Sequence, residues 1–165
     1  MIPASILEKA KNIQLVVTDI DGVWTDATIY YSAEGEVLKA FSYYDGMGTY
    51  MLRQSNIKVA IITGENSPIV LKRAAKLGIE DVYLGVRDKL AILEELLQKY
   101  ELDLSQVAYI GDDVNDLGCM QVAGLTAAPA NTPAFHLLEP DVLLQRSGGD
   151  GAFREFADLI LAARE

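Results

Sequence analysis

The stretch "VVTDIDGVWTD", which runs from Val16 to Asp26, follows an apolar run with three closely spaced carboxylates. They belong to Asp19, Asp21 and Asp26. Like charges at short range repel one another, so this arrangement requires either a compensating cation or a function that uses a carboxylate held at high energy. The preceding run, "IQLVVTD", is apolar at consecutive positions, which is typical of a central parallel strand that is buried on both faces.

Length, composition and charge limit the class of protein. A chain of 165 residues can bury a sizeable core, and we expect one domain over residues 1–165. An apolar content of 50% argues against intrinsic disorder. The net charge of −10 argues against a nucleic acid as partner, because phosphate backbones are bound by clustered Lys and Arg. A small anionic substrate needs only local cations or a metal and stays compatible with this charge.

Cysteine usage and hydropathy indicate a cytoplasmic protein with no membrane partner. Cys119 is the single cysteine, so no intramolecular disulfide can form, as expected in a reducing compartment. No apolar run approaches the roughly 20 residues needed to span a bilayer. The opening segment "MIPASILEKAKN" lacks the apolar core of a signal peptide. Within it, "SILE" (Ser5 to Glu8) is expected to open a helix as a capping box.

Strand and helix patterns alternate along the rest of the chain. Strands are expected at 57–64, 82–85 and 107–113 and, late in the chain, in "GLTAAP" and "DVLLQ"; helices are expected at 67–78, 88–100 and 153–165. In the first of these helices, Ser67 is the expected N-cap, Pro68 the first helical residue and Gly78 the residue after the end. The alternation predicts an α/β fold with a doubly wound, mostly parallel, Rossmann-like sheet.

One segment interrupts this alternation. Residues 28–31 and 36–41 are β-prone and flank "SAEG", which predicts a β-hairpin at about 27–42 with Gly35 in the turn. The segment is rich in tyrosine and leaves the sheet beside the clustered carboxylates. We interpret it as a lid or an oligomer contact rather than as an inert surface flap.

Polar residues recur where the predicted strands end. In doubly wound sheets, ligands bind beyond the carboxyl ends of the strands. The residues expected at that edge are Asp19, Asp21, Thr63, Glu65, Lys89, Asp112, Asp113 and Asp116. The carboxylates among them offer only oxygen ligands, and a dense group of oxygen ligands suits Mg²⁺. A single Asp after a strand is more often a turn former or a helix cap, but the ordered set indicates a catalytic site.

The motifs "DIDGVWTD", "ITGE" and "GDDVND", with a lysine before the last of them, together resemble the haloacid dehalogenase (HAD) superfamily of phosphohydrolases. The resemblance covers essentially the whole chain. The hairpin, the following "FSYYDGMG" and the tail "RSGGDGAFREF" are similar to its branch without a cap domain. That branch includes phosphatases of 3-deoxy-D-manno-octulosonate 8-phosphate and of 2-keto-3-deoxynononate 9-phosphate. The resemblance therefore implies a HAD-like phosphatase of a sugar-acid phosphate.

The resemblance also implies roles for the acidic residues. Asp19 would be the nucleophile that forms an aspartyl-phosphate, and Asp21 the general acid and base. Mg²⁺ would bind the carboxylates of Asp19 and Asp112 and the backbone carbonyl of Asp21. Asp116 would position either the catalytic lysine or a metal-bound water, whereas the roles of Asp113 and Asp26 stay open.

Two further residues complete the implied catalytic set. Thr63 would donate a hydrogen bond to a phosphoryl oxygen, and Lys89 would neutralise charge on the phosphoryl group and on the nucleophile. Ala27 departs from the family pattern, which commonly has glycine after "TD".

The substrate signals in the sequence conflict. "SYYDGMG" is closer to the octulosonate type, whereas Glu65 and Lys76 are closer to the nononate type. Because these two residues are expected nearer the pocket, we expect the nine-carbon substrate, with the octulosonate 8-phosphate as the alternative. In the tail, Arg146 or Arg154 could reach a substrate carboxylate.

The tail and the hairpin also suggest an assembly. Glycines 148, 149 and 151 are expected to form a mobile hinge, unless they only cap the last helix. The resemblance implies a homotetramer in which four hairpins form a central barrel and neighbouring subunits cover each site. Lone His136 is expected at the surface or at a helix cap, and Cys119 in a helix as an inert buried thiol.

Two non-catalytic interpretations compete with the phosphatase. A receiver domain of a signalling protein carries its phosphorylatable Asp on the third strand, whereas the third strand here ends in "YLG". A degenerate domain that serves only as a protein partner would have lost a catalytic residue, and none of the expected set is missing.

Overall fold

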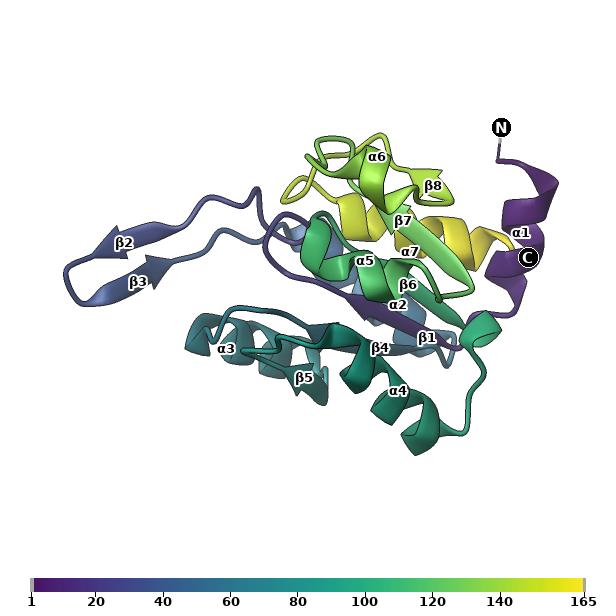
Figure 1. Cartoon of the computed structure of the whole chain (residues 1–165), viewed down its shortest axis with the longest axis horizontal. Helices are drawn as coiled ribbons and strands as arrows, with labels where there is room; N and C mark the ends of the chain where they lie inside the picture. Colours follow the sequence, from purple (N-terminus) through teal and green to yellow (C-terminus); the bar gives the residue numbers. More distant parts are fainter. Residues whose placement is uncertain (1, 165) are drawn as a thin grey trace.

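Six parallel strands form the central sheet of the protein, which a computed structural model describes for residues 2–164 (Figure 1). Their order across the sheet is β5-β4-β1-β6-β7-β8. Their bounds are β1 Leu15–Thr18, β4 Lys58–Ile62, β5 Asp81–Tyr83, β6 Val107–Ile110, β7 Leu125–Ala128 and β8 Val142–Leu143. β1 lies between β4 and β6 and runs parallel to both, so the carboxyl ends of these three strands lie at the same edge of the sheet. The predicted parallel α/β sheet is confirmed.

Helices cover both faces of this sheet. One face carries α1 (Ala4–Lys11), α2 (Tyr43–Gln54), α3 (Pro68–Leu77) and α7 (Ala152–Ala162). The other carries α4 (Lys89–Tyr100), α5 (Leu117–Met120) and α6 (Phe135–Leu138). Two short 3-10 turns, η1 (Leu104–Gln106) and η2 (Val114–Asp116), precede β6 and α5.

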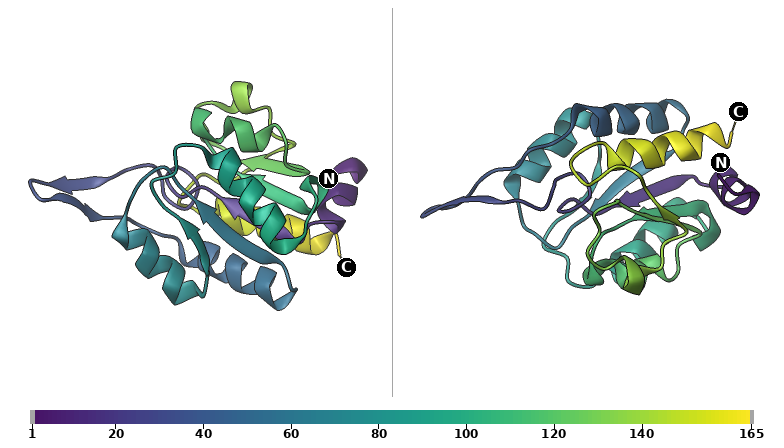
Figure 2. Two further views of the ribbon diagram at one scale, coloured as in Figure 1. Left: turned by 60° about the horizontal axis from the view of Figure 1, so that its bottom comes forward. Right: turned by 90° about the horizontal axis from the view of Figure 1, so that it is seen from above.

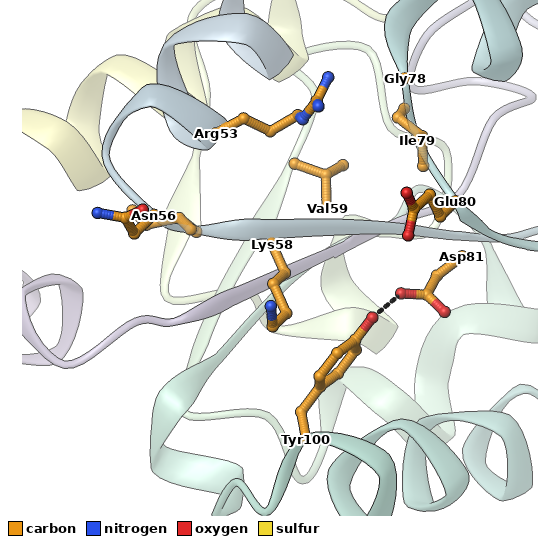
Figure 3. Close-up of a pocket in the computed structure, with 10 residues that line it drawn as sticks. Arg53, Asn56, Lys58, Val59, Gly78, Ile79, Glu80, Asp81 and Tyr100 are labelled. Atoms are coloured by element: carbon orange, nitrogen blue, oxygen red, sulfur yellow. Dashed lines mark hydrogen bonds between the residues drawn. The ribbon is translucent and has the colours of Figure 1, made fainter.

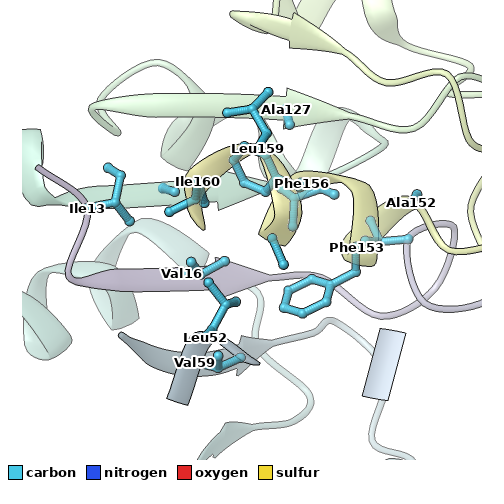
Figure 4. Packing of buried hydrophobic residues seen from close by; sticks show 14 of the residues in the cluster. Ile13, Val16, Leu52, Val59, Ala127, Ala152, Phe153, Phe156, Leu159 and Ile160 are labelled. Carbon is cyan, nitrogen blue, oxygen red and sulfur yellow. The ribbon is translucent and has the colours of Figure 1, made fainter. Parts of the chain in front are cut away.

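Alternate side chains of β1 supply the two hydrophobic cores. Val16 packs into the core under α7, while Leu15 and Val17 pack into the core under α4. Figure 4 shows the first core, where Phe153 and Phe156 of α7 face the sheet. Both cores are fully buried at β1, so the strand that precedes the carboxylates is held on each side.

The hairpin projects from the body of the molecule, on the side away from the termini (Figures 1 and 2). Its strands are β2 (Tyr30–Ser32) and β3 (Gly35–Leu38), which pair antiparallel. They are shorter than predicted, because the chain turns back to the body after Leu38. There Lys39 buries its side chain, and Phe41 packs against the core and beneath the Arg73 guanidinium.

The capping expected at two helix starts differs in the structure. The capping box at Ser5 is wrong: Pro3 is the N-cap of α1, and its carbonyl accepts the N–H groups of Ile6 and Leu7. At α3, Ser67 occupies the N-cap as predicted, but its hydroxyl forms no capping hydrogen bond. Gly78 ends α3 in the left-handed conformation at φ 69°, as predicted.

Within residues 2–164, no helix has the length and apolar character that a membrane crossing requires.

Candidate active site

The loop after β1 is anchored to the core by a chain of hydrogen bonds. The indole N–H of Trp24 donates to the Thr18 hydroxyl at 3.0 Å, and that hydroxyl donates to the backbone carbonyl of Asp19 at 2.6 Å. Trp24 is fully buried and packs against Phe153 with ring centroids 4.8 Å apart. Asp19 is thereby held at the end of a rigid strand rather than on a free loop.

Lys89 joins two of the buried carboxylates. It opens α4, and its ammonium lies 2.8 Å from Asp19 Oδ2 and 2.7 Å from Asp116 Oδ1. All three side chains are buried. A buried ammonium between two carboxylates offsets charge that would otherwise be strongly destabilising. The structure therefore brings these three residues together, as expected from the sequence.

Asp116 has all of its acceptor positions engaged by protein groups. Tyr109 donates its phenol to Asp116 Oδ1 at 2.7 Å, beside Lys89. The backbone N–H groups of Asp112 and Asp113 donate to Asp116 Oδ2 at 3.0 and 3.4 Å. Asp116 thus orients the lysine and the "GDDVND" loop. Tyr109 was not foreseen, since a tyrosine inside an apolar strand reads as core.

Asp112 sits against the loop that follows Asp19. A methyl group on Gly22 would lie 1.7 Å from Asp112 Oδ2, so only glycine allows this approach. Gly22 also has φ 85°, in the region that favours glycine. Ligand oxygens of Asp19, Asp112 and Asp116 lie within 4.8 Å of one another. Asp19, Gly22, Asp112 and Asp116 therefore form one buried acidic site, which we call the cradle.

The protonation behaviour of this cradle follows from burial. Burial, and next the charge of Asp116, raises the pKa of Asp19 to about 7, although Lys89 opposes the shift. Burial, and next the charges of Asp19 and Asp116, raises the pKa of Asp112 to about 8. A cation bound between these carboxylates would favour their ionised forms. Oxygen ligands and an excess of negative charge are the features that fit Mg²⁺.

A pocket of about 190 Å³ opens at this edge of the sheet. Its lining residues are Asp19, Asp21, Ala27, Thr63, Gly64, Glu65, Asp112, Asp113 and Asn115. Thr63 follows β4, is buried, and is fixed by backbone hydrogen bonds to Tyr83 and Val86. Glu65 is exposed in the next turn. The expected residues from three strand ends thus line one cavity.

Comparison with known proteins assigns the family. The sequence family of haloacid dehalogenase-like hydrolases matches residues 27–124. A 3-deoxy-D-manno-octulosonate 8-phosphate phosphatase from Haemophilus influenzae is 41% identical over 157 residues, which cover 95% of this chain and 87% of that protein. This chain belongs to the haloacid dehalogenase-like hydrolases.

Solved structures of relatives have the same fold. The structure of this hydrolase superposes on 3-deoxy-D-manno-octulosonate 8-phosphate phosphatase from Yersinia pestis with a TM-score of 0.94 at 42% identity, covering 98% of this chain and 87% of that chain. The corresponding phosphatase from Moraxella catarrhalis, solved with a magnesium ion, phosphate and KDO, gives a TM-score of 0.91 at 42% identity, covering 96% of this chain and 91% of that chain. The HAD-like fold inferred from the motifs is confirmed.

Asp21 of the hydrolase contacts a residue that sequence reasoning missed. The Lys39 ammonium lies 2.5 Å from Asp21 Oδ1 and 2.8 Å from Glu36 Oε1, and the Lys39 side chain is fully buried. Lys39 follows β3 at the base of the hairpin. The signal available in the sequence was a lysine within a predicted strand, two residues before Phe41, which is indistinguishable from a solvated charge.

The residues expected to bind substrate are not all brought to the pocket. Glu65 lines it, but Lys76 is exposed in the last turn of α3 and is not among the lining residues. Arg146 donates to the backbone carbonyl of Asp150, and Arg154 pairs with Asp158 at 2.8 Å. In this chain, both arginines are engaged with the tail's own groups.

The glycines of the tail form a contact surface, not the free hinge that was expected. A methyl group on Gly148 would lie 2.0 Å from the carbonyl oxygen of Gly22, and Gly149 donates its N–H to Val23. Gly151, at φ 87°, is the N-cap of α7. Close backbone approach therefore explains the first two glycines, and helix capping explains the third, which was the alternative interpretation.

The residues with open or minor roles have structural functions. Asp26 accepts the N–H of Thr28 at 2.9 Å at the root of the hairpin. Asp113 caps η2 by accepting the N–H of Val114 at 2.7 Å, and it also borders the pocket. His136 is exposed in α6, and Cys119 is buried in α5, as expected.

Two other cavities lie away from this edge. The one in Figure 3 is about 290 Å³ and contains Arg53, Lys58 and Asp81. Its charges are largely satisfied internally, since Asp81 pairs with Lys99 and Lys58 lies over the Tyr100 ring. The second, of about 550 Å³, lies between α1, β8 and α7 and has a mainly apolar lining. Neither contains the acidic motifs.

Proposed function

We propose that this phosphatase hydrolyses a 3-deoxy sugar-acid phosphate through a phosphoryl group carried on Asp19. One observation carries the proposal: Lys89 bridges Asp19 and Asp116 in a buried acidic cradle at the carboxyl edge of the sheet. The cradle lines a small open pocket. A nucleophile held beside a fixed ammonium suits phosphoryl transfer, which depends chiefly on positioning and charge stabilisation.

Asp19 has the position required of a nucleophile. Its Oδ2 is held by Lys89, and its Oδ1 accepts the N–H of Ile20 at 2.7 Å. Two donors fix the plane of the carboxylate, so one lone pair can be aimed at phosphorus. Lys89 would stabilise negative charge on the transferring group, and Asp116, held by Tyr109, would keep Lys89 in place.

Asp21 and Thr63 complete the proposed set. Asp21, two residues after the nucleophile, would give a proton to the leaving oxygen and later take one from water. Thr63 is buried, follows β4 and lines the pocket, so its hydroxyl could donate to a phosphoryl oxygen. The two residues would thus act on the leaving oxygen and on the phosphoryl group, respectively.

The phosphatase uses Mg²⁺. The proposed ligands are the carboxylates of Asp19 and Asp112 and the backbone carbonyl of Asp21. Asp116 is excluded because each of its oxygens already has two protein donors, whereas each Asp19 oxygen has one. When bound, the ion would supply positive charge that orients the phosphoryl oxygens. The surrounding carboxylates hold their geometry through the hydrogen bonds described above. The carboxylate oxygens of Asp19 and Asp112 lie within 4.8 Å of each other, which supports this assignment.

For the substrate, we propose 3-deoxy-D-manno-octulosonate 8-phosphate. The relatives are named phosphatases of that compound, and the identity spans nearly the whole chain. The nine-carbon preference expected from Glu65 and Lys76 has no support from these names. Only Glu65 of that pair borders the pocket. The octulosonate 8-phosphate, which is the alternative substrate on sequence alone, is therefore the better supported one.

We further propose one domain that assembles as a homotetramer through the hairpin. The hairpin exposes large apolar side chains, including Tyr30, Tyr31, Val37 and Leu38. Exposed apolar surface on a projecting, unpaired hairpin favours pairing with another copy. Contacts from neighbouring subunits would also narrow a site that the single chain leaves open. Light scattering should give about four times the chain mass.

A substrate panel tests the function. Phosphate release would be measured with the octulosonate 8-phosphate, 2-keto-3-deoxynononate 9-phosphate and N-acetylneuraminate 9-phosphate. The highest kcat/KM is expected for the eight-carbon substrate. A higher value for a nine-carbon acid would restore the initial expectation without changing the mechanism. No turnover of any phosphate ester would instead favour a non-catalytic role.

A further inference from the structure

Lys39 makes a contact whose geometry is unusual for a surface hairpin. Its side chain is 0% exposed, and its ammonium touches carboxylates from two different segments. Burying a charge is unfavourable unless its partners are well placed. The partners here are Asp21, on the loop after β1, and Glu36, on β3. The contact therefore ties the hairpin to the loop that carries Asp21.

The two oxygens of Asp21 have different surroundings. Oδ1 accepts a hydrogen bond from Lys39 at 2.5 Å. Oδ2 is buried and has no hydrogen-bond partner among residues 2–164. Asp21 also lines the pocket. Buried carboxylate oxygens usually have a partner, so an unpartnered one beside a pocket is an oxygen available to a ligand.

We propose that Lys39 is the positioning residue of Asp21: by holding Oδ1, it leaves Oδ2 as the atom that exchanges protons during the reaction. This deepens the proposed function and rests on it. In the first step an Asp19 oxygen bonds to phosphorus and the ester P–O bond breaks; the leaving oxygen keeps the bonding electrons and takes the proton that Oδ2 carries. In the second step, water gives a proton to Oδ2 while its oxygen bonds to phosphorus and the bond to Asp19 breaks.

The position of Lys39 separates its role from that of Lys89. Lys89 contacts Asp19 and Asp116 and so acts on the phosphoryl side of the site. Lys39 reaches Asp21 from the hairpin, and Glu36 holds the same ammonium from within β3. Loss of Lys39 should therefore impair proton transfer to the leaving group and spare the attack on phosphorus.

Two esters with different leaving groups distinguish these effects. An alkyl phosphate, such as the sugar-acid substrate, needs a proton on its leaving oxygen, whereas dinitrophenyl phosphate releases a stable phenolate without one. Lys39→Met should lower kcat/KM, which covers only the steps up to transfer of the phosphoryl group to Asp19, by about 100-fold on the alkyl ester and by less than about 10-fold on the aryl ester. A crystal structure of the variant should show the Asp21 carboxylate turned away from its original position.

Three variants serve as comparisons. Asp21→Asn should show the same dependence on leaving group as Lys39→Met. Glu36→Gln removes the second partner of the ammonium and should show a smaller loss with that same dependence, and it remains informative if Lys39→Met fails to fold. Lys58→Met removes an exposed lysine that lies over the Tyr100 ring, far from the pocket, and should leave both activities unchanged.

Two results would overturn the inference. One is an equal loss of kcat/KM on both esters in Lys39→Met when Asp21→Asn shows the expected dependence. The other is wild-type kinetics in Lys39→Met with an unmoved Asp21. Failure of the unmodified protein to hydrolyse either ester would be a different result, because it would overturn the proposed function itself.

Discussion

Asp45 allows a quantitative test of the packing between α2 and α7. It is fully buried in the first turn of α2, and its Oδ1 accepts the N–H of Arg154 at 2.9 Å, near the start of α7. Its Oδ2 is buried with no hydrogen-bond partner among residues 2–164. Burial raises the pKa of Asp45 to about 6, against opposing contributions from the Arg154 N–H, Arg73 and Arg146.

The sign of the effect on stability follows from proton binding. Between pH values near 4 and 6, the folded state binds this proton and the unfolded state does not, so stability falls as pH rises through this window. A raised pKa of about 6 against the ordinary 3.8 corresponds to about 3 kcal/mol at neutral pH. By the same relation, roughly half of this penalty develops between pH values of about 5 and 7.5.

Asp45→Asn removes this titration while keeping an oxygen that can accept from Arg154. Relative to the wild type, the variant should gain about 1–2 kcal/mol in free energy of unfolding as the pH rises from about 5 to about 7.5. Urea unfolding, followed by fluorescence of the single tryptophan, Trp24, is a suitable assay, because Trp24 packs on Phe153 in α7. Protein concentration must be equal in all samples, since assembly contributes to stability.

Comparing the two proteins at each pH cancels the titration of Asp19 and Asp112, which both share. Asp103→Asn, at an exposed helix cap, is the matched control for an Asp to Asn change. A difference in stability between wild type and Asp45→Asn that does not vary with pH would refute this reasoning. It would mean that Asp45 is ionised at no extra cost in the folded protein.

Four further predictions concern the site and the hairpin root. Asp19→Asn should lose at least about 1,000-fold in kcat with the fold retained in circular dichroism, because the nucleophile is removed; near wild-type turnover would exclude the mechanism. EDTA should abolish phosphate release and Mg²⁺ should restore it, and activity at negligible metal content would contradict the metal assignment. Tyr109→Phe deletes one hydrogen bond to Asp116 and should lower the free energy of unfolding by about 1–3 kcal/mol, with a several-fold loss in kcat; an unchanged kcat would make Tyr109 purely structural. Ala27 has φ 66°, so Ala27→Gly should leave the free energy of unfolding within about 0.5 kcal/mol, because relief of strain offsets the added flexibility of the unfolded chain; a loss above about 1 kcal/mol would contradict this.

The sequence by itself determined the parts that depend on local pattern. Continuous apolar runs identified the parallel strands, since residues buried on both faces must all be apolar. Parallel strands place their carboxyl ends at one edge, so the convergence of Asp19, Thr63 and Asp112 could be predicted from their positions alone. The order of these motifs also assigned the family, which the comparisons confirmed.

Only the tertiary structure decided the contacts between segments distant in sequence. Lys39 and Tyr109 read as a solvated charge and a core residue, because their partners, Asp21 and Asp116, are brought to them by folding. The tail glycines suggested a hinge, whereas the fold packs Gly148 against the loop after β1. Side-chain pairing of this kind depends on distances set by the whole sheet and its helices, which no local periodicity encodes.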